Sequence, residues 1–146
     1  MDEEYFLDTS ALFKRYVREA GANVVFSLFA QDASRFISSL TLCEVVSNLK
    51  RLQDVGGLLT DAEFKALKAS FLGEVGDGLL LLVEPTSAVI LTSMEIIAEK
   101  YVTPLDAIQL ATALSLSRKP IFVCADQKLI RLAAEYGLAT LDPLAG

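Results

Sequence analysis

Four acidic residues occupy positions where predicted strands end or helices begin, and they are the side chains of this sequence best placed to do chemistry: Asp8, Glu44, Asp106 and Asp126. The sequence contains no histidine. Catalysis by Ser-His-Asp or Cys-His groups and zinc sites with histidine ligands are therefore excluded. Any catalytic step must use carboxylates, hydroxyls, Lys, Tyr or a thiol.

The hydrophobic pattern predicts the elements that position these acids. Strands are expected at 4–8 and 35–38, buried strands at 79–83 and 120–125, and a final edge strand at 138–141. Helices are expected at 9–17, 24–32, 42–52, 60–71, 86–97, 104–114 and 126–136, and glycines between 73 and 78 stop the fourth of them. Strands that alternate with helices indicate an α/β protein: a central parallel sheet of four to five strands between two helical layers, as one domain over residues 1–146.

The four acids are expected to converge at one edge of this sheet. Asp8 closes the first strand and Asp126 directly follows the fourth. Glu44 lies one turn into the helix after the second strand, and Asp106 lies in the first turn of the helix that Thr103 and Pro104 open. Ligands of open parallel sheets bind outside the carboxyl ends of the strands. The sequence therefore predicts one acidic pocket there.

Each acid also has a structural interpretation. Asp8 and Asp126 are good helix N-caps, and Asp106 fits a capping arrangement with Thr103. Glu44 is surrounded by apolar residues, so a solvated helix face describes it poorly. Carboxylates about 4 Å apart repel by about 4 kcal/mol at an effective dielectric near 20, so a cluster of them needs a counter-charge. Hard oxygen ligands select Mg²⁺ or Mn²⁺, whose natural chemistry with phosphates is phosphodiester hydrolysis.

Charge and composition limit the other possibilities. With 13 Lys and Arg against 19 Asp and Glu, the net charge is −6, which opposes simple electrostatic binding of nucleic acid. The longest apolar runs have five residues and the N-terminus is acidic, so we expect neither a membrane span nor export, and a cytoplasmic protein. Cys43 and Cys124 stand in apolar contexts and are expected to be buried thiols.

Four short motifs in this order and spacing resemble a PIN domain, specifically the VapC-like toxins of prokaryotic toxin–antitoxin pairs. They are Leu7-Asp8-Thr9-Ser10-Ala11-Leu12, Glu44-Val45, Pro104-Leu105-Asp106-Ala107 and Ala125-Asp126-Gln127-Lys128-Leu129. The resemblance spans Tyr5 to Leu141. It implies an endoribonuclease that depends on Mg²⁺ or Mn²⁺, with RNA as substrate, on a parallel α/β/α fold.

By the same resemblance, the four acids form the catalytic and metal-binding quartet, and the Ser10 hydroxyl helps to orient metal or substrate. Cys124 stands where family members commonly have Thr or Ser, which leaves a hydroxyl contribution there unsupported. Arg51 lies two helical turns beyond Glu44 on the same helix face and is a candidate to orient the substrate. Other lone cations on helices are expected to be solvated.

Partners follow from the resemblance and from composition. The family is usually homodimeric, and the mean hydropathy of +0.45 suggests that a partner covers some apolar surface. An antitoxin peptide is expected in an apolar groove between the helices of 42–52 and 64–71, unless both apolar stripes face the sheet. Two alternatives to a nuclease remain open: a PIN-type module that binds RNA or protein without cutting, and Mg²⁺-dependent phosphotransfer through an aspartyl-phosphate on Asp8.

Overall fold

A parallel sheet of five strands runs through the middle of the protein, in the order β3-β2-β1-β4-β5. The computed structural model describes residues 3–145; Met1, Asp2 and Gly146 lie outside the described residues. The strands are β1 (Glu3–Leu7), β2 (Ala33–Ser38), β3 (Leu81–Val83), β4 (Ile121–Val123) and β5 (Thr140–Leu141). Every neighbouring pair is parallel, so all carboxyl ends lie at one edge of the sheet.

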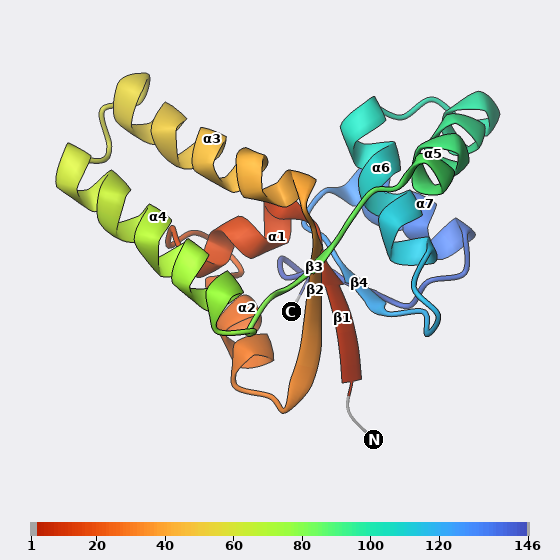
Figure 1. Cartoon of the computed structure of the whole chain (residues 1–146), viewed down its shortest axis with the longest axis horizontal. Helices are drawn as coiled ribbons and strands as arrows, with labels where there is room; N and C mark the ends of the chain where they lie inside the picture. The colour runs from red at the N-terminus through yellow and green to blue at the C-terminus, as the bar shows by residue number, and fades with distance from the viewer. Residues whose placement is uncertain (1–2, 146) are drawn as a thin grey trace.

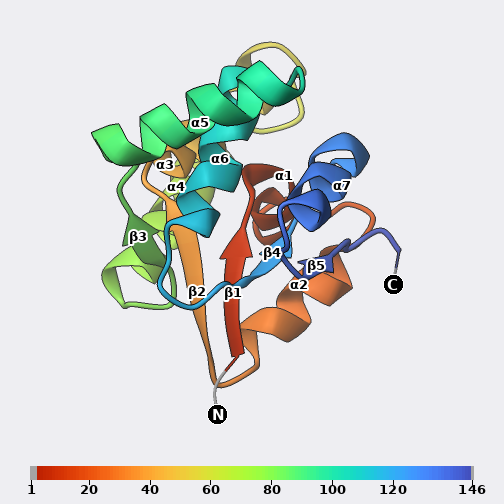
Figure 2. The ribbon, with the colours of Figure 1, turned by 90° about the vertical axis from the view of Figure 1, so that its right-hand side faces the viewer.

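Helices cover both faces of the sheet, which confirms the predicted three-layer α/β/α class (Figures 1 and 2). One face carries α1 (Thr9–Leu12), the 3-10 helix η1 (Phe13–Arg15), α2 (Ala22–Phe29), α3 (Leu40–Asp54) and α4 (Asp61–Gly76). The other carries α5 (Ser87–Glu99), α6 (Pro104–Leu114) and α7 (Gln127–Glu135). The helices of the two faces form two lobes that rise beyond the sheet and diverge (Figure 1).

Alternation along the central strands divides the core into two parts. In β1, Tyr5 and Leu7 pack towards α1–α4, whereas Phe6 packs towards α5–α7. Phe6 stacks on Phe122 of β4 with ring centroids 5.8 Å apart. Because β1 is apolar on both faces and covered by both lobes, its carboxyl end is rigidly held, and Asp8 follows directly.

Helix boundaries follow the expected capping residues. Thr60 forms the predicted capping box with Glu63, Thr86 caps α5, and Thr103 caps α6 with Pro104 in the first turn. Gly137 ends α7 with a φ of +90°, which side chains with a Cβ rarely adopt. The helical turn after Asp8 is shorter than predicted, because α1 gives way to a 3-10 turn. Within residues 3–145, no helix combines the length and apolarity needed to cross a membrane.

The expectation that glycines between 73 and 78 stop the fourth helix is confirmed, because α4 ends at Gly76. Two other sequence-based expectations are wrong. The strand at 79–83 is not buried: β3 pairs only with β2, and Leu81 and Leu82 are 39% and 43% exposed. Cys43 is exposed, because it lies on the side of α3 opposite Val45 and away from the sheet. An apolar run or context does not specify which neighbours cover it, and this is where these expectations failed.

Candidate active site

Asp8 is a buried carboxylate at the carboxyl end of β1. Its backbone N–H donates to Val123 O on β4 at 2.9 Å. Its Oδ2 accepts hydrogen bonds from Ser10 N at 3.1 Å and from Ser10 Oγ at 2.6 Å, so Asp8 also caps α1. Burial raises the pKa of Asp8 to about 6, against the opposing effect of the Ser10 hydrogen bonds, and the charges of Asp106 and Glu44 raise it further.

Ser10 and Cys124 both contact the Asp8 carboxylate. Ser10 Oγ accepts a hydrogen bond from Ala125 N at 3.1 Å, which joins α1 to the segment after β4. The Cys124 thiol is buried, 3.7 Å from Asp8 Oδ2. Burial, together with the charge of Asp8, raises the pKa of Cys124, so the thiol stays protonated and acts as a weak donor. A thiol therefore occupies the place where the resemblance leads one to expect a hydroxyl.

Glu44 reaches the same place from α3, where a polar network holds one of its oxygens. Glu44 Oε1 accepts hydrogen bonds from Thr9 Oγ1 at 2.8 Å and from Gln109 Nε2 at 3.0 Å. Gln109 Nε2 also donates to Thr41 Oγ1 at 2.9 Å. The sequence pattern did not single out Thr9, Thr41 or Gln109 as site residues. A signal existed, because Gln109 is polar within an otherwise apolar helix and lies one turn after Asp106, and Thr41 lies one turn before Glu44.

Asp106 and Asp126 complete the group from α6 and α7. Burial raises the pKa of Asp106, and the charges of Asp126 and Glu44 raise it further, while a hydrogen bond with Thr103 and the charge of Lys128 lower it. Asp126 caps α7 by accepting from Leu129 N at 3.0 Å. The capping interpretation of Asp8 and Asp126 is therefore correct, and it is compatible with their proximity to the other acids.

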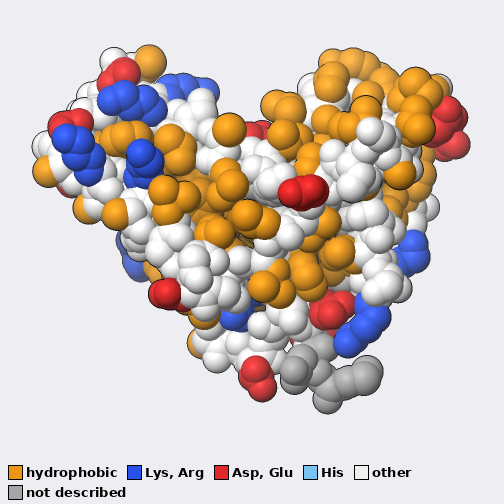
Figure 3. All heavy atoms as spheres, in the orientation of Figure 1, with side chains coloured by type: hydrophobic (Ala, Val, Ile, Leu, Met, Phe, Trp, Pro, Cys, Tyr) orange, Lys and Arg blue, Asp and Glu red, His pale blue; other side chains and the backbone are white. Residues whose placement is uncertain are grey.

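The four predicted acids lie near enough for their charges to act on one another in pairs. The charges of Asp106 and Glu44 raise the pKa of Asp8, and the charges of Asp126 and Glu44 raise the pKa of Asp106. Between the two lobes the surface is hollowed, and acidic atoms are visible in the hollow (Figure 3). Such mutual repulsion favours either a proton or a bound cation.

The carboxylate oxygens of this group are suitable ligands for a hard divalent cation, although the side chains are not arranged around a single ion. Within residues 3–145, no three Asp, Glu or Cys side chains are arranged so that they could hold a metal ion directly. Hydrogen bonds occupy Asp8 Oδ2 and Glu44 Oε1. Burial first, and the charges of neighbouring acids second, raise the pKa of both Asp8 and Asp106, so a cation beside them would stabilise their charged forms. Carboxylate oxygens are the ligands that Mg²⁺ and Mn²⁺ select.

Arg51 does not join this group. It lines a separate cavity of about 270 Å³ with Phe13, Asn48 and Leu52. Arg51 itself lies about 10 Å beyond Glu44 along the axis of α3, at a rise of 1.5 Å per residue. Lys and Arg side chains gather on the lobe formed by α3 and α4 (Figure 3).

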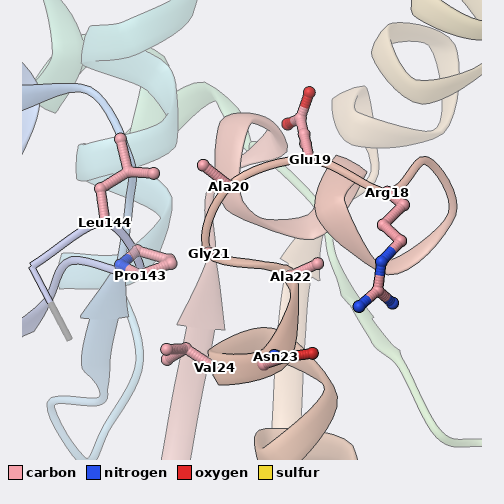
Figure 4. A pocket seen from close by; sticks show the side chains of 9 residues that line it. All are labelled: Arg18, Glu19, Ala20, Gly21, Ala22, Asn23, Val24, Pro143 and Leu144. Atoms are coloured by element: carbon pink, nitrogen blue, oxygen red, sulfur yellow. The ribbon is translucent and has the colours of Figure 1, made fainter.

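Another pocket, of about 360 Å³, lies beside the C-terminal segment and contains none of the four acids. It is formed by the turn that leads into α2 and by Pro143 and Leu144 (Figure 4). Gly21 has a φ of +87°, and a Cβ there would lie 3.0 Å from Pro143 O. The carboxylate of Glu19, which also lines it, pairs with Lys14 at 3.0 Å. This pocket is thus part of the packing between the turn and the C-terminal segment.

A family model for the PIN domain matches residues 5–135. The chain belongs to the PIN-domain family. The match covers all four acids. PIN domains are generally nucleases that use divalent metals, so membership of the family supports a hydrolase at that level. Comparison of the sequence with curated proteins finds no match.

Solved structures share the fold of this PIN domain at low sequence identity. A chain from a structure of FitAB bound to an IR36 DNA fragment is 17% identical, with a TM-score of 0.70 over 96% of this chain and 95% of that one. A chain of a toxin–antitoxin complex from Klebsiella pneumoniae is 17% identical, with a TM-score of 0.66 over 95% of this chain and 97% of that one. A chain of VapBC2 from Rickettsia felis, bound to a promoter DNA fragment, is 14% identical, with a TM-score of 0.66 over 95% of this chain and 98% of that one. At these identities the neighbours show that this chain shares their fold.

Proposed function

We propose that this PIN domain is an endoribonuclease dependent on Mg²⁺ or Mn²⁺, and that it is the toxin of a toxin–antitoxin pair. The observation that carries the nuclease proposal is the group of four carboxylates at the carboxyl edge of the sheet, two of which have raised pKa values because burial and like charges act on them. Such a group is costly to fold and becomes useful when a cation binds.

The residues have distinct tasks in this mechanism. Asp8, Glu44, Asp106 and Asp126 would hold the cation, which when bound activates water and neutralises charge on the phosphate. Ser10 orients the Asp8 carboxylate by holding Oδ2. Asp8 and Asp126 are fixed further because they cap helices. Arg51, on the lobe rich in Lys and Arg, would contact a phosphate of the RNA strand away from the scissile bond.

Incubation of the purified protein with labelled single-stranded RNA tests the activity. Cleavage with Mn²⁺ or Mg²⁺ that a chelator abolishes, and that Asp106→Asn removes, is the expected result. Binding of the same RNA without cleavage would identify a binding module instead. A phosphoryl group trapped on Asp8 would identify phosphotransfer.

The antitoxin partner is proposed for an apolar groove between α3 and α4. The apolar stripe of α3 is divided: Val45 and Leu49 pack on the sheet, whereas Leu42 and Val46 line a cavity of about 610 Å³ with Phe64 and other residues. An amphipathic helix binds such a groove through its apolar face. We expect the product of an adjacent reading frame to co-purify with the protein, and Val46→Glu to disrupt the complex. A toxin with such a partner would act in the cytoplasm.

A homodimer is proposed through the opposite lobe and the neighbouring edge strand. Large apolar side chains on β3 and α5 remain exposed over about two fifths or more of their surface: Leu81, Leu82, Ile90, Leu91 and Met94. A second copy that covers this face would bury an exposed strand edge as well as apolar surface. Light scattering should give twice the mass of 15.8 kDa for the protein and the monomer mass for Leu91→Glu.

A further inference from the structure

Three polar side chains are buried where α1, α3 and α6 meet, directly behind Glu44. Gln109 is 2% exposed, and Thr9 and Thr41 are also buried. Burial of polar groups is costly unless they form hydrogen bonds. Within residues 3–145, the side-chain hydrogen bonds of these residues go to one another and to Glu44.

The number of N–H and O–H donors in this network fixes the direction of each of its hydrogen bonds. The Gln109 amide has two N–H donors, and its shortest contacts are Thr41 Oγ1 at 2.9 Å and Glu44 Oε1 at 3.0 Å. The Thr9 hydroxyl donates to Glu44 Oε1 at 2.8 Å, so the Thr41 hydroxyl donates to Thr9 Oγ1 at 3.2 Å. Every hydroxyl hydrogen is then used, and Glu44 Oε1 accepts two hydrogen bonds.

The carboxylate of Glu44 determines which way the Gln109 amide faces. With the amide reversed, its oxygen would face Glu44 Oε1 at about the same distance, and two acceptors would repel. In the observed orientation, Gln109 Oε1 is buried without a hydrogen-bond partner. Leaving a buried acceptor unsatisfied costs about 1–3 kcal/mol. A network that served packing alone would gain nothing from this arrangement, whereas one that fixes Glu44 requires it.

We propose that Gln109 is a positioning residue: together with Thr9 it holds Glu44 Oε1, so that Oε2 remains available for the metal ion. Within residues 3–145, Oε2 accepts no hydrogen bond. The inference rests on the proposed function, because it assigns Glu44 to the metal. Partners that orient a metal ligand in this way typically change metal affinity or activity by about 10- to 100-fold when removed.

Calorimetric titration with Mn²⁺ tests the proposal on the full chain, without reference to RNA cleavage. Gln109→Leu removes the amide and keeps most of the volume. Thr112→Val is the matched control, because Thr112 is equally buried on α6 but donates only to Ile108 O in its own helix, at 2.6 Å. Circular dichroism and urea unfolding show whether each variant is folded. Both variants are repeated with Glu44→Gln as background.

We expect Gln109→Leu to weaken Mn²⁺ binding about 10- to 100-fold, and Thr112→Val to change it less than about twofold. In the Glu44→Gln background, Gln109→Leu should have little further effect, because the residue acts through Glu44. An equal loss in both backgrounds, or no loss in either, would overturn the positioning role while the proposed function stands. No binding of Mn²⁺ by the unmodified protein would overturn both. If Gln109→Leu does not fold, Thr9→Val removes the other donor to Oε1, and the same outcomes decide.

Discussion

The protein contains two groups of charged side chains, and only one of them has its charges paired within the chain. Near η1 and α4, Arg15 donates to Glu74 Oε2 through both Nη2 at 2.5 Å and Nε at 3.2 Å, and its guanidinium lies 4.1 Å from the centre of the Phe29 ring. Arg35, below it, donates to three backbone carbonyls. Every cation of this group has a partner within the chain, which is how charge stabilises a fold.

The carboxylates at the sheet edge lack such balance. The charge of Lys128, which lies over the ring of Tyr101, lowers the pKa of Asp106. Within residues 3–145, the Asp8 carboxylate accepts hydrogen bonds only from neutral groups, those of Ser10 and Cys124. Paired charges thus serve stability, whereas the unpaired charges at the edge are the ones that the proposed cation would balance. Each prediction below tests one side of this difference.

The largest effect is expected when one of the unpaired acids is neutralised. Asp106→Asn removes a charge that the cation needs, so the rate of metal-dependent RNA cleavage should fall by more than about 1,000-fold. Asp54→Asn, an exposed acid on α3, is the matched control and should retain the unmodified rate. Retention of cleavage by Asp106→Asn would remove this residue from the site.

The second effect is a dependence of stability on pH. The pKa of Asp8 is about 6 in the folded protein against 3.8 in the unfolded chain, so folded Asp8 binds its proton more tightly. Stability from this group is complete below about pH 3.8 and is lost as the pH rises to about 6, by about 3 kcal/mol. Asp8→Asn keeps a good N-cap and should therefore become more stable than the unmodified metal-free protein as the pH rises through this range. A constant difference in urea unfolding across the range would contradict this.

The paired group should respond in the opposite direction. Arg15→Met leaves the Glu74 carboxylate half-buried without its partner, so the free energy of unfolding should fall by about 2 kcal/mol. Binding of Mn²⁺ should not change, because no member of this group contacts the acids. Thermal unfolding and calorimetry on the same sample separate these outcomes. Loss of Mn²⁺ binding in a folded Arg15→Met variant would show that the two groups are coupled.

The smallest effect is expected at Arg51, which makes no ion pair within residues 3–145. If it contacts an RNA phosphate, Arg51→Ala should weaken RNA binding only about two- to fivefold and reduce the salt dependence of binding by about one ion. Binding is measured in the Asp106→Asn background, which prevents cleavage. Lys65→Ala, on the same lobe but paired with Asp61, is the control. Equal effects of both variants would assign the contact to the lobe as a whole.

The sequence alone determined the strands, the caps and the positions of the acids along the chain. Asp8 and Asp126 follow apolar runs, and Thr103 with Pro104 starts the helix that carries Asp106, so each position depends on residues a few places away. Parallel strands share one carboxyl edge, and this rule predicts from the sequence that the acids lie near one another. Local signals of this kind survive in the fold because the backbone hydrogen bonds that they govern are themselves local.

Only the tertiary structure decided what surrounds those residues. Gln109 and Thr9 are 100 positions apart and meet only because α1 and α6 lie on opposite faces of the same sheet edge. Likewise, β3 is exposed because it forms the edge of the described sheet. The apolar stripe of α3 is divided between the sheet and the groove that α3 forms with α4. Neighbours of this kind are chosen by packing over the whole chain, and neither periodicity nor residue type records them.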